Sequence, residues 1–163
     1  MTRAVAAPAI LRRARPEEAD ALTALALASK AHWGYDAAFL ARCRPALTLR
    51  PDAMPGLRAH VAELSGRLAG FFTVTGAPPE GALEHLYVAP AAIGQGVGRA
   101  LLRRALELAR EEGFRSLAIH ADPHAEAFYL GQGAVRRGEV PSEAIPGRLL
   151  PLLSIDCDPP REA

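Results

Sequence analysis

Cysteines, long apolar runs and an excess of charge of either sign are all scarce in this sequence of 163 residues. The two cysteines, Cys43 and Cys157, lie far apart, which favours reduced thiols in a cytoplasmic protein over a disulfide framework. No run approaches the ~20 apolar residues of a membrane span, and the apolar N-terminus is interrupted by Pro8 and too short for a secretory signal. We therefore expect a cytoplasmic protein that has no membrane partner.

The charge is nearly balanced, with 19 Lys+Arg residues against 18 Asp+Glu residues and a formal net charge of +1. Binding to a nucleic-acid backbone requires a concentrated basic face. Here the basic residues are scattered, so we expect no nucleic-acid partner. The bias toward Arg, Ala, Gly and Pro, with Lys30 as the one lysine, is typical of a GC-rich bacterial genome. The length and the 50% hydrophobic content predict a single domain over residues 1–163.

The most informative stretch is a predicted strand over residues 83–90 that runs into a glycine-rich helix start. Alternation places Glu84, Leu86 and Val88 on one face of this strand and His85 and Tyr87 on the other. The following segment has glycines at three alternate positions, 94, 96 and 98, where the first amides of a helix lack internal acceptors. Such bare N–H groups form a binding site for an anion such as a pyrophosphate.

Two common phosphate-binding motifs do not fit this segment. A P-loop requires Gly-Lys-Ser/Thr, whereas Gly98 is followed by Arg99 and Ala100, and a dinucleotide fingerprint would need a third glycine where Arg99 stands. The segments Val88-Ala89-Pro90 and Gly96-Val97-Gly98 instead resemble the coenzyme A loop of the GNAT acetyltransferase superfamily. Ile93 departs from that pattern, because the family usually has Gln or Arg there.

The expected order of elements also resembles the GNAT fold. Turn residues and periodicity predict the order βααβββαβαββ, with strands near 9–14, 57–64, 67–74, 83–90, 117–120, 134–137 and 149–155, and helices near 16–34, 36–45, 97–113 and 122–133. Asp36 and Asp122 are the expected helix caps, Pro45 the expected end of the second helix, and Ser65-Gly66 a hairpin turn. We therefore predict an α/β (α+β) three-layer fold, in which about four helices flank a mixed central sheet of about six to seven strands.

A second resemblance lies in residues 122–133. An aromatic pair on an amphipathic helix is ordinarily a core feature, but Phe128-Tyr129 with Gly133 resembles the GNAT segment whose tyrosine lies near the coenzyme A sulfur. We take His124 as the counterpart of the asparagine that begins this segment in the family.

The resemblance implies a role for each part of the site, with acetyl-CoA as co-substrate. Tyr129 would be the acid that protonates the departing thiolate, and Glu84, His85 or a water molecule the base. The acceptor would be bound by a segment containing His32, Trp33 and Tyr35, together with the loop 141–147. Cofactor contacts are expected from Leu86, Tyr87, Val88, Gly94, Gln95, Gly96, Val97, Gly98, Arg99 and His124.

The function expected from this resemblance is acetyl transfer from acetyl-CoA to a primary amine by direct attack in a ternary complex. We expect the acceptor to be a small-molecule or peptide amine and the protein to be a monomer or homodimer. Two alternatives stay open: an acyl-CoA-binding regulatory module with decayed catalysis, and an acyltransferase using another acyl chain or acceptor. The alternation His120-x-Asp122-x-His124 offers three metal ligands, but a strand end that turns into a helix cap would scatter them, so we expect no metal.

Overall fold

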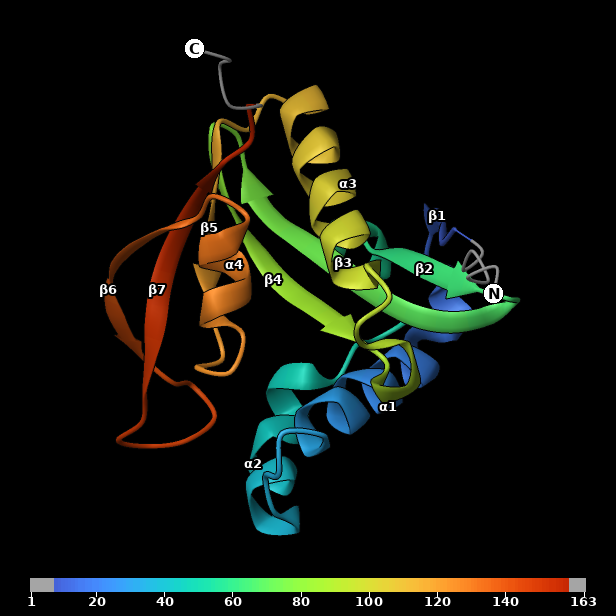
Figure 1. Ribbon diagram of the computed structural model, residues 1–163, viewed down its shortest axis with the longest axis vertical. Coiled ribbons are helices and arrows are strands. Elements are labelled where there is room, and N and C mark those ends of the chain that lie inside the picture. The colour runs from blue at the N-terminus through green and yellow to red at the C-terminus, as the bar shows by residue number, and fades with distance from the viewer. Residues whose placement is uncertain (1–7, 159–163) are drawn as a thin grey trace, which may run out of the picture.

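A mixed sheet of seven strands, in the order β1-β2-β3-β4-β5-β7-β6, organises the computed structural model (Figure 1). The structure describes residues 8–158, so most of the segment considered as a secretory signal, residues 1–7, lies outside it. The elements are β1 (Ile10–Arg13), α1 (Ala19–Ala31), α2 (Ala37–Leu47), β2 (His60–Leu64), β3 (Arg67–Ala77), β4 (Glu80–Val88), α3 (Val97–Glu111), β5 (Ser116–His120), α4 (Glu126–Gly131), β6 (Val135–Pro141) and β7 (Leu149–Asp156). This order confirms the predicted one. None of the helices within residues 8–158 has the length and apolar character to span a membrane.

Among the strands within residues 8–158, β4 and β5 form the single parallel pair, and they stay together only briefly. Their register runs from Glu80 opposite Ser116 to Ala82 opposite Ala118. Beyond this point β4 continues to Val88 without pairing to β5, and the two strands separate (Figure 1). The second half of β4 therefore keeps one edge of unpaired N–H and C=O groups next to the start of α3.

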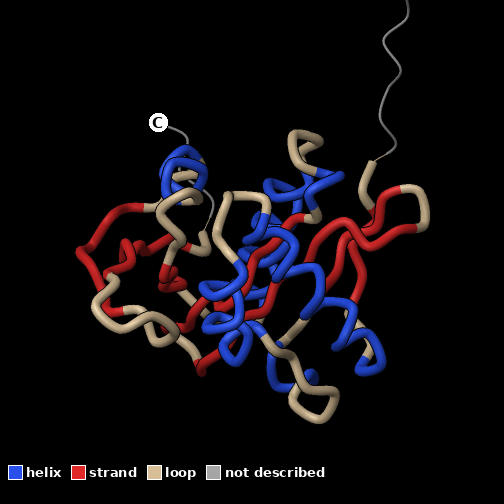
Figure 2. Tube along the Cα trace, turned by 90° about the horizontal axis from the view of Figure 1, so that it is seen from below, coloured by secondary structure: helices blue, strands red, loops and turns tan. Residues whose placement is uncertain are grey.

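Helices cover both faces of the sheet, as the view from below shows (Figure 2). On one face α3 packs against the central strands through Val97, Leu101, Leu102, Ala105 and Ala109. The close approach of α3 depends on Gly70, where a Cβ atom would lie 2.7 Å from the Tyr87 carbonyl oxygen and 2.8 Å from Leu101 Cδ1. On the other face α1 and α2 form a second core, which includes Leu22, Leu25, Ala26, Cys43, Leu47, Val61 and Phe71.

Several expected boundaries were wrong. Strand β3 continues to Ala77, β4 begins at Glu80 and β6 continues to Pro141, so these strands are longer at those ends than expected. Helix α2 passes through Pro45 to Leu47, because burial of Cys43 and Leu47 holds the last turn although the proline removes one hydrogen bond. Residues 54–57 form a 3₁₀ turn, and Arg58 follows in the left-handed region (φ 48°), so the second strand begins later than expected. Helix α4 begins only at Glu126. Asp122 was expected to cap α4, but its carboxylate is drawn into a cluster of side chains described below.

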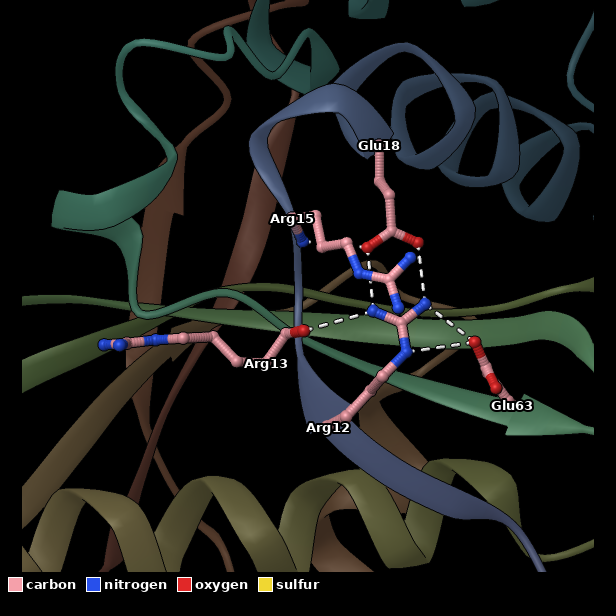
Figure 3. A network of polar contacts seen from close by, with 5 residues as sticks. All are labelled: Arg12, Arg13, Arg15, Glu18 and Glu63. Carbon is pink, nitrogen blue, oxygen red and sulfur yellow. Dashed lines mark hydrogen bonds and ion pairs between the residues drawn. The ribbon is translucent and has the colours of Figure 1, made fainter.

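Arg12 joins β1 to the start of α1 and to β2 (Figure 3). Its Nη1 and Nη2 donate to the two carboxylate oxygens of Glu18 at 2.8 Å each, and its Nε and Nη2 donate to Glu63 Oε1 at 3.0 and 2.7 Å. Hydrogen bonds from Arg12 lower the pKa of Glu18 to about 2. The carboxylate of Glu18 therefore stabilises the fold above its ordinary pKa near 4.5, and this contribution is lost as the pH falls through about 2.

We expect Arg12→Met to lower the free energy of unfolding at pH 7 by about 1–3 kcal/mol, because hydrogen bonds to charged groups are lost and two carboxylates are left close together. Urea unfolding at pH 7 and at pH 3 measures this, and the difference from the wild type should shrink at the lower pH. The control is Arg50→Met, since the Arg50 side chain is 75% exposed and its ion pair with Asp52 is 3.6 Å long; we expect a change below about 0.5 kcal/mol. An equal loss in both variants would show that the Arg12 cluster contributes no more than a surface pair.

Candidate active site

A bulge in β4 displaces Glu84 from the regular strand. Thr73 of β3 lies opposite His85, whereas the next residue, Val74, lies opposite Leu83, so Glu84 is the extra residue on β4. The predicted alternation holds from His85 to Val88 but fails at Glu84, which does not continue the face of Leu86 and Val88. Its side chain is exposed, and it forms no hydrogen bond or ion pair with a residue in 8–158.

A cleft of about 400 Å³ lies where β4 separates from β5. It is bounded by the open edge of β4, the start of α3, the loop after β5 and the inner side of α4. The predicted site residues that line it are Trp33, Glu84, Leu86, Tyr87, Val88, Gly94, Gly96, Val97, Gly98, Arg99, His124 and Tyr129. The structure therefore brings together most of the cofactor residues predicted from the sequence. Gln95 points elsewhere, and its Nε2 donates to the Ala91 carbonyl at 3.0 Å.

The loop between β4 and α3 presents free backbone amides to this cleft. The first bonded amide of the helix is that of Ala100, which donates to the Gly96 carbonyl at 3.1 Å, and within residues 8–158 the amides of residues 94–99 have no acceptor. Gly94 and Gly96 have φ of 83° and 79°, a left-handed backbone that L side chains rarely adopt. Gly98 has no such φ, and a Cβ there would meet Phe128 and Val88 at 3.5 Å, an ordinary contact. This arrangement suits a pyrophosphate, because N–H groups and the helix dipole point at the same place.

Two tyrosines reach the inner end of the cleft. Tyr129 of α4 is 6% exposed, and its hydroxyl makes no hydrogen bond with a residue in 8–158. Burial raises the pKa of Tyr129 above its usual value, so the phenol stays protonated. Burial likewise raises the pKa of Tyr87, whose side chain lines both this cleft and a second cavity.

His85 has both ring nitrogens engaged by the protein. Its Nδ1 lies 2.7 Å from the Thr73 hydroxyl and its Nε2 lies 3.3 Å from the Ala46 carbonyl oxygen. Because a carbonyl only accepts, Nε2 carries the proton and Nδ1 accepts from Thr73. Burial lowers the pKa of His85, which keeps the ring neutral. The ring thus connects β4 to β3 and α2, and Glu84 is left as the free candidate base.

The second cavity, of about 250 Å³, adjoins the cleft and shares Lys30, Leu83, Glu84, Tyr87, His120 and Asp122 with it. We call it the acceptor pocket, after the role that is proposed for it below. Its outer wall is the segment between β6 and β7, through Pro141, Ser142, Glu143, Ala144 and Arg148. This segment is the loop that the sequence indicated as an acceptor wall.

The rings of the aromatic segment 32–35, which is expected to bind the acceptor, have three different surroundings. Trp33 stacks on His124 with ring centroids 5.2 Å apart and lines the cleft instead of the acceptor pocket. His32 packs edgewise on Trp33 and lines neither cavity. Tyr35 lines neither cavity, and its hydroxyl donates to Asp122. Of the three aromatic rings of this segment, that of Trp33 is the one that lines either of these two cavities.

Asp122 contacts Lys30, Tyr35 and Arg148, and we call these four residues the Asp122 cluster. Each of them comes from a different segment of the chain. The carboxylate accepts from Lys30 Nζ at 2.9 Å, from the Tyr35 hydroxyl at 3.0 and 3.1 Å and from the backbone amide of His124 at 2.8 Å. Burial alone would raise the pKa of Asp122, but Lys30 and these hydrogen bonds outweigh it and lower that pKa. Burial and the neighbouring carboxylate raise the pKa of Tyr35 to about 12.

Sequence reasoning missed this cluster, because its members are far apart in the chain. The single lysine was the one available signal, and composition does not say what it contacts. In the GNAT segment that residues 122–133 resemble, the asparagine stands three positions before an alanine and six before the aromatic pair. Asp122 has this spacing to Ala125 and Phe128, so the correspondence drawn with His124 was wrong by two residues. Within residues 8–158 no three His, Cys, Asp or Glu side chains are arranged to hold a metal ion.

The separated parallel strands and the free amides at the start of α3 are the fold and site of an acyltransferase. The chain belongs to the acetyltransferase (GNAT) family, whose profile matches residues 23–133. A comparison with curated proteins found no match.

Solved structures agree with this fold. A GCN5-related N-acetyltransferase from Rhodopseudomonas palustris is 24% identical, with 95% of this chain and 99% of that one covered and a TM-score of 0.80. The PaiA N-acetyltransferase from Thermoplasma acidophilum, solved in complex with coenzyme A, is 14% identical, with 92% and 99% covered and a TM-score of 0.76. Nourseothricin acetyltransferase is 32% identical over 64% of this chain and 67% of that one, with a TM-score of 0.59.

Proposed function

We propose that the protein transfers an acetyl group from acetyl-CoA to the primary amine of a small molecule or peptide in a ternary complex. The observation that carries this proposal is the open edge of β4, which leads directly into the free amides of residues 94–99. An extended pantetheine arm carries amide groups that suit an unpaired strand edge, and a pyrophosphate suits a helix N-terminus. Membership of the GNAT family and the coenzyme A complex of a structure with the same fold support the assignment.

The residues around the cleft supply the steps that the reaction needs. Attack of the amine on the thioester carbon forms a C–N bond, and loss of the thiolate breaks the C–S bond. Main-chain N–H groups near Leu86 and Val88 stabilise the oxyanion that forms between these events. Glu84 takes the proton of the amine, directly or through one water molecule, and Tyr129 donates its hydroxyl proton to the departing sulfur.

Thiol release from acetyl-CoA in the presence of a panel of primary amines tests this function. We expect release that depends on the amine and yields the N-acetyl product. Tight coenzyme A binding without turnover of any amine would instead support a regulatory module. Faster turnover with a longer acyl-CoA or with an alcohol would support the other alternative.

We expect Gly96→Val to weaken coenzyme A binding by about tenfold. A β-branched residue disfavours the left-handed backbone by roughly 1–2 kcal/mol, so the variant loop relaxes and must be forced back when the phosphates bind. Titration calorimetry with coenzyme A measures the affinity.

Gly66→Val is the matched control, because Gly66 has φ 78° in the hairpin between β2 and β3 and lines neither the cleft nor the acceptor pocket. It should lower stability and leave the affinity for coenzyme A unchanged. Wild-type affinity in a folded Gly96→Val variant would contradict the role of this loop.

A further inference from the structure

We propose that the acceptor carries a carboxylate group in addition to its amine, and that Arg148 in the wall of the acceptor pocket binds this carboxylate. The inference rests on the proposed function and narrows it to amino-acid-like acceptors. It is carried by the contacts of Arg148, by its charge surroundings and by the position of Glu84 in the same pocket.

Arg148 is held in place before any ligand binds. Its amide donates to the Ile145 carbonyl at 3.2 Å and its carbonyl accepts from the Ser142 amide at 2.8 Å, which fixes the backbone at the base of the loop. Its guanidinium lies over the rings of Phe39 and Tyr35, at 4.9 and 5.2 Å from their centroids. A planar guanidinium fixed in this way loses little conformational freedom when it binds a carboxylate.

Most hydrogen-bond donors of this guanidinium are unused. A guanidinium has five N–H donors, and within residues 8–158 the side chain makes one hydrogen bond, from Nη2 to the Tyr35 hydroxyl at 2.7 Å. Asp122 is 3.7 Å away and already accepts from Lys30, Tyr35 and a backbone amide. The side chain of Arg148 is 20% exposed and lines the acceptor pocket, so the free donors are accessible from that cavity.

The Asp122 cluster also contains more positive than negative charge. Lys30 and Arg148 are both cations, Asp122 is the one anion, and Tyr35 stays neutral because its pKa is raised to about 12. Side chains of Lys30 and Arg148 are only 11% and 20% exposed, so the solvent compensates their charge poorly. A ligand carboxylate in the acceptor pocket would supply a second negative charge, so that each of the two cations of the cluster would have an anionic partner. It could form a bidentate contact with the guanidinium of Arg148.

Glu84 carries a free negative charge in the same pocket. An amine bound beside Glu84 and a carboxylate bound by Arg148 make the pocket complementary to an amino acid. The volume of about 250 Å³ suits a small molecule. A diamine is the rival acceptor, because Glu143 also lines the pocket. Glu143 is exposed and forms no hydrogen bond or ion pair with a residue in 8–158, so it lacks the fixed geometry of Arg148.

The test compares each of several amino acids with its carboxamide, which keeps the amine and removes the negative charge. For the wild type we expect kcat/KM to favour the carboxylate form of the preferred acceptor by at least about tenfold. In Arg148→Met this ratio should fall to near one, mostly through the KM of the carboxylate form, while the KM of acetyl-CoA changes little. Arg148→Lys should restore part of the ratio, because the charge is kept and the bidentate geometry is lost.

Arg137→Met is the control, because Arg137 is an exposed arginine of β6 that lines neither the cleft nor the acceptor pocket; it should leave the ratio at its wild-type value. Preference of the wild type for diamines, with loss of that preference in Glu143→Gln, would overturn the proposal in favour of a polyamine-like acceptor. An unchanged ratio in Arg148→Met that still turns over the carboxamide would also overturn it. Absence of turnover with every amine would contradict the proposed function itself, and this result can be distinguished from failure of the carboxylate proposal alone.

Discussion

Changing Tyr129 to Phe is expected to lower kcat by about 10²–10⁴-fold while the affinity for acetyl-CoA changes little. The substitution removes only the hydroxyl and keeps the ring, which packs in the core beneath α4. A raised pKa keeps this phenol protonated at neutral pH, so the group is always ready to donate. The thiol of the leaving group has a pKa of about 8.5, so its thiolate is a fair leaving group. The hydroxyl therefore acts mainly by stabilising charge on sulfur in the transition state.

Single-turnover kinetics and direct titration of coenzyme A separate the chemical step from binding. Tyr87→Phe is the comparison, since Tyr87 also lines the cleft with a raised pKa. A large loss of kcat in Tyr87→Phe with none in Tyr129→Phe would identify Tyr87 of β4 as the acid. A loss of coenzyme A affinity with normal kcat would mean that the Tyr129 hydroxyl binds the cofactor.

The order of the elements could be predicted because local signals agree with the tertiary structure. The apolar face of α3, the turn at Ser65-Gly66 and the glycines before α3 each depend on residues close together in the chain. Pro45 shows where a local rule fails, because burial of the neighbouring residues keeps the helix intact beyond it.

The centre of the site depends on contacts that no local pattern contains. The bulge at Glu84 arises from the register between β3 and β4, and alternation along β4 alone does not indicate it. The partners of His85, Thr73 and the Ala46 carbonyl, come from two other elements. Lys30 and Asp122 are 92 positions apart, and Tyr35 and Arg148 are 113 apart. The sequence therefore indicated the cofactor loop better than the acceptor side.

Replacing Glu84 by Gln is expected to lower kcat/KM for the amine by about 10²–10⁴-fold, the usual contribution of a general base. The bulge points this carboxylate out of the sheet, where it lines both the cleft and the acceptor pocket and has no partner within residues 8–158.

The pH dependence of the Glu84→Gln variant makes this prediction specific. An acceptor that arrives as an ammonium ion must lose a proton before attack, whereas at a pH above its own pKa it arrives as the free amine. The loss of kcat/KM in Glu84→Gln, relative to the wild type, should therefore shrink as the pH rises toward the pKa of the chosen acceptor. For a more basic amine this recovery should occur at a higher pH. Initial rates of thiol release with two amines of different basicity, measured for wild type and variant from pH 6 to about pH 10, test this directly.

Glu80→Gln is the matched control, since Glu80 begins the same strand, is exposed and lines neither cavity. It should behave as wild type across the pH range. A deficit of Glu84→Gln that is the same at every pH would mean that the carboxylate positions the acceptor and takes no proton. Wild-type rates in Glu84→Gln, together with a large loss in His85→Gln, would assign the base to the ring that now bonds Thr73 and the Ala46 carbonyl.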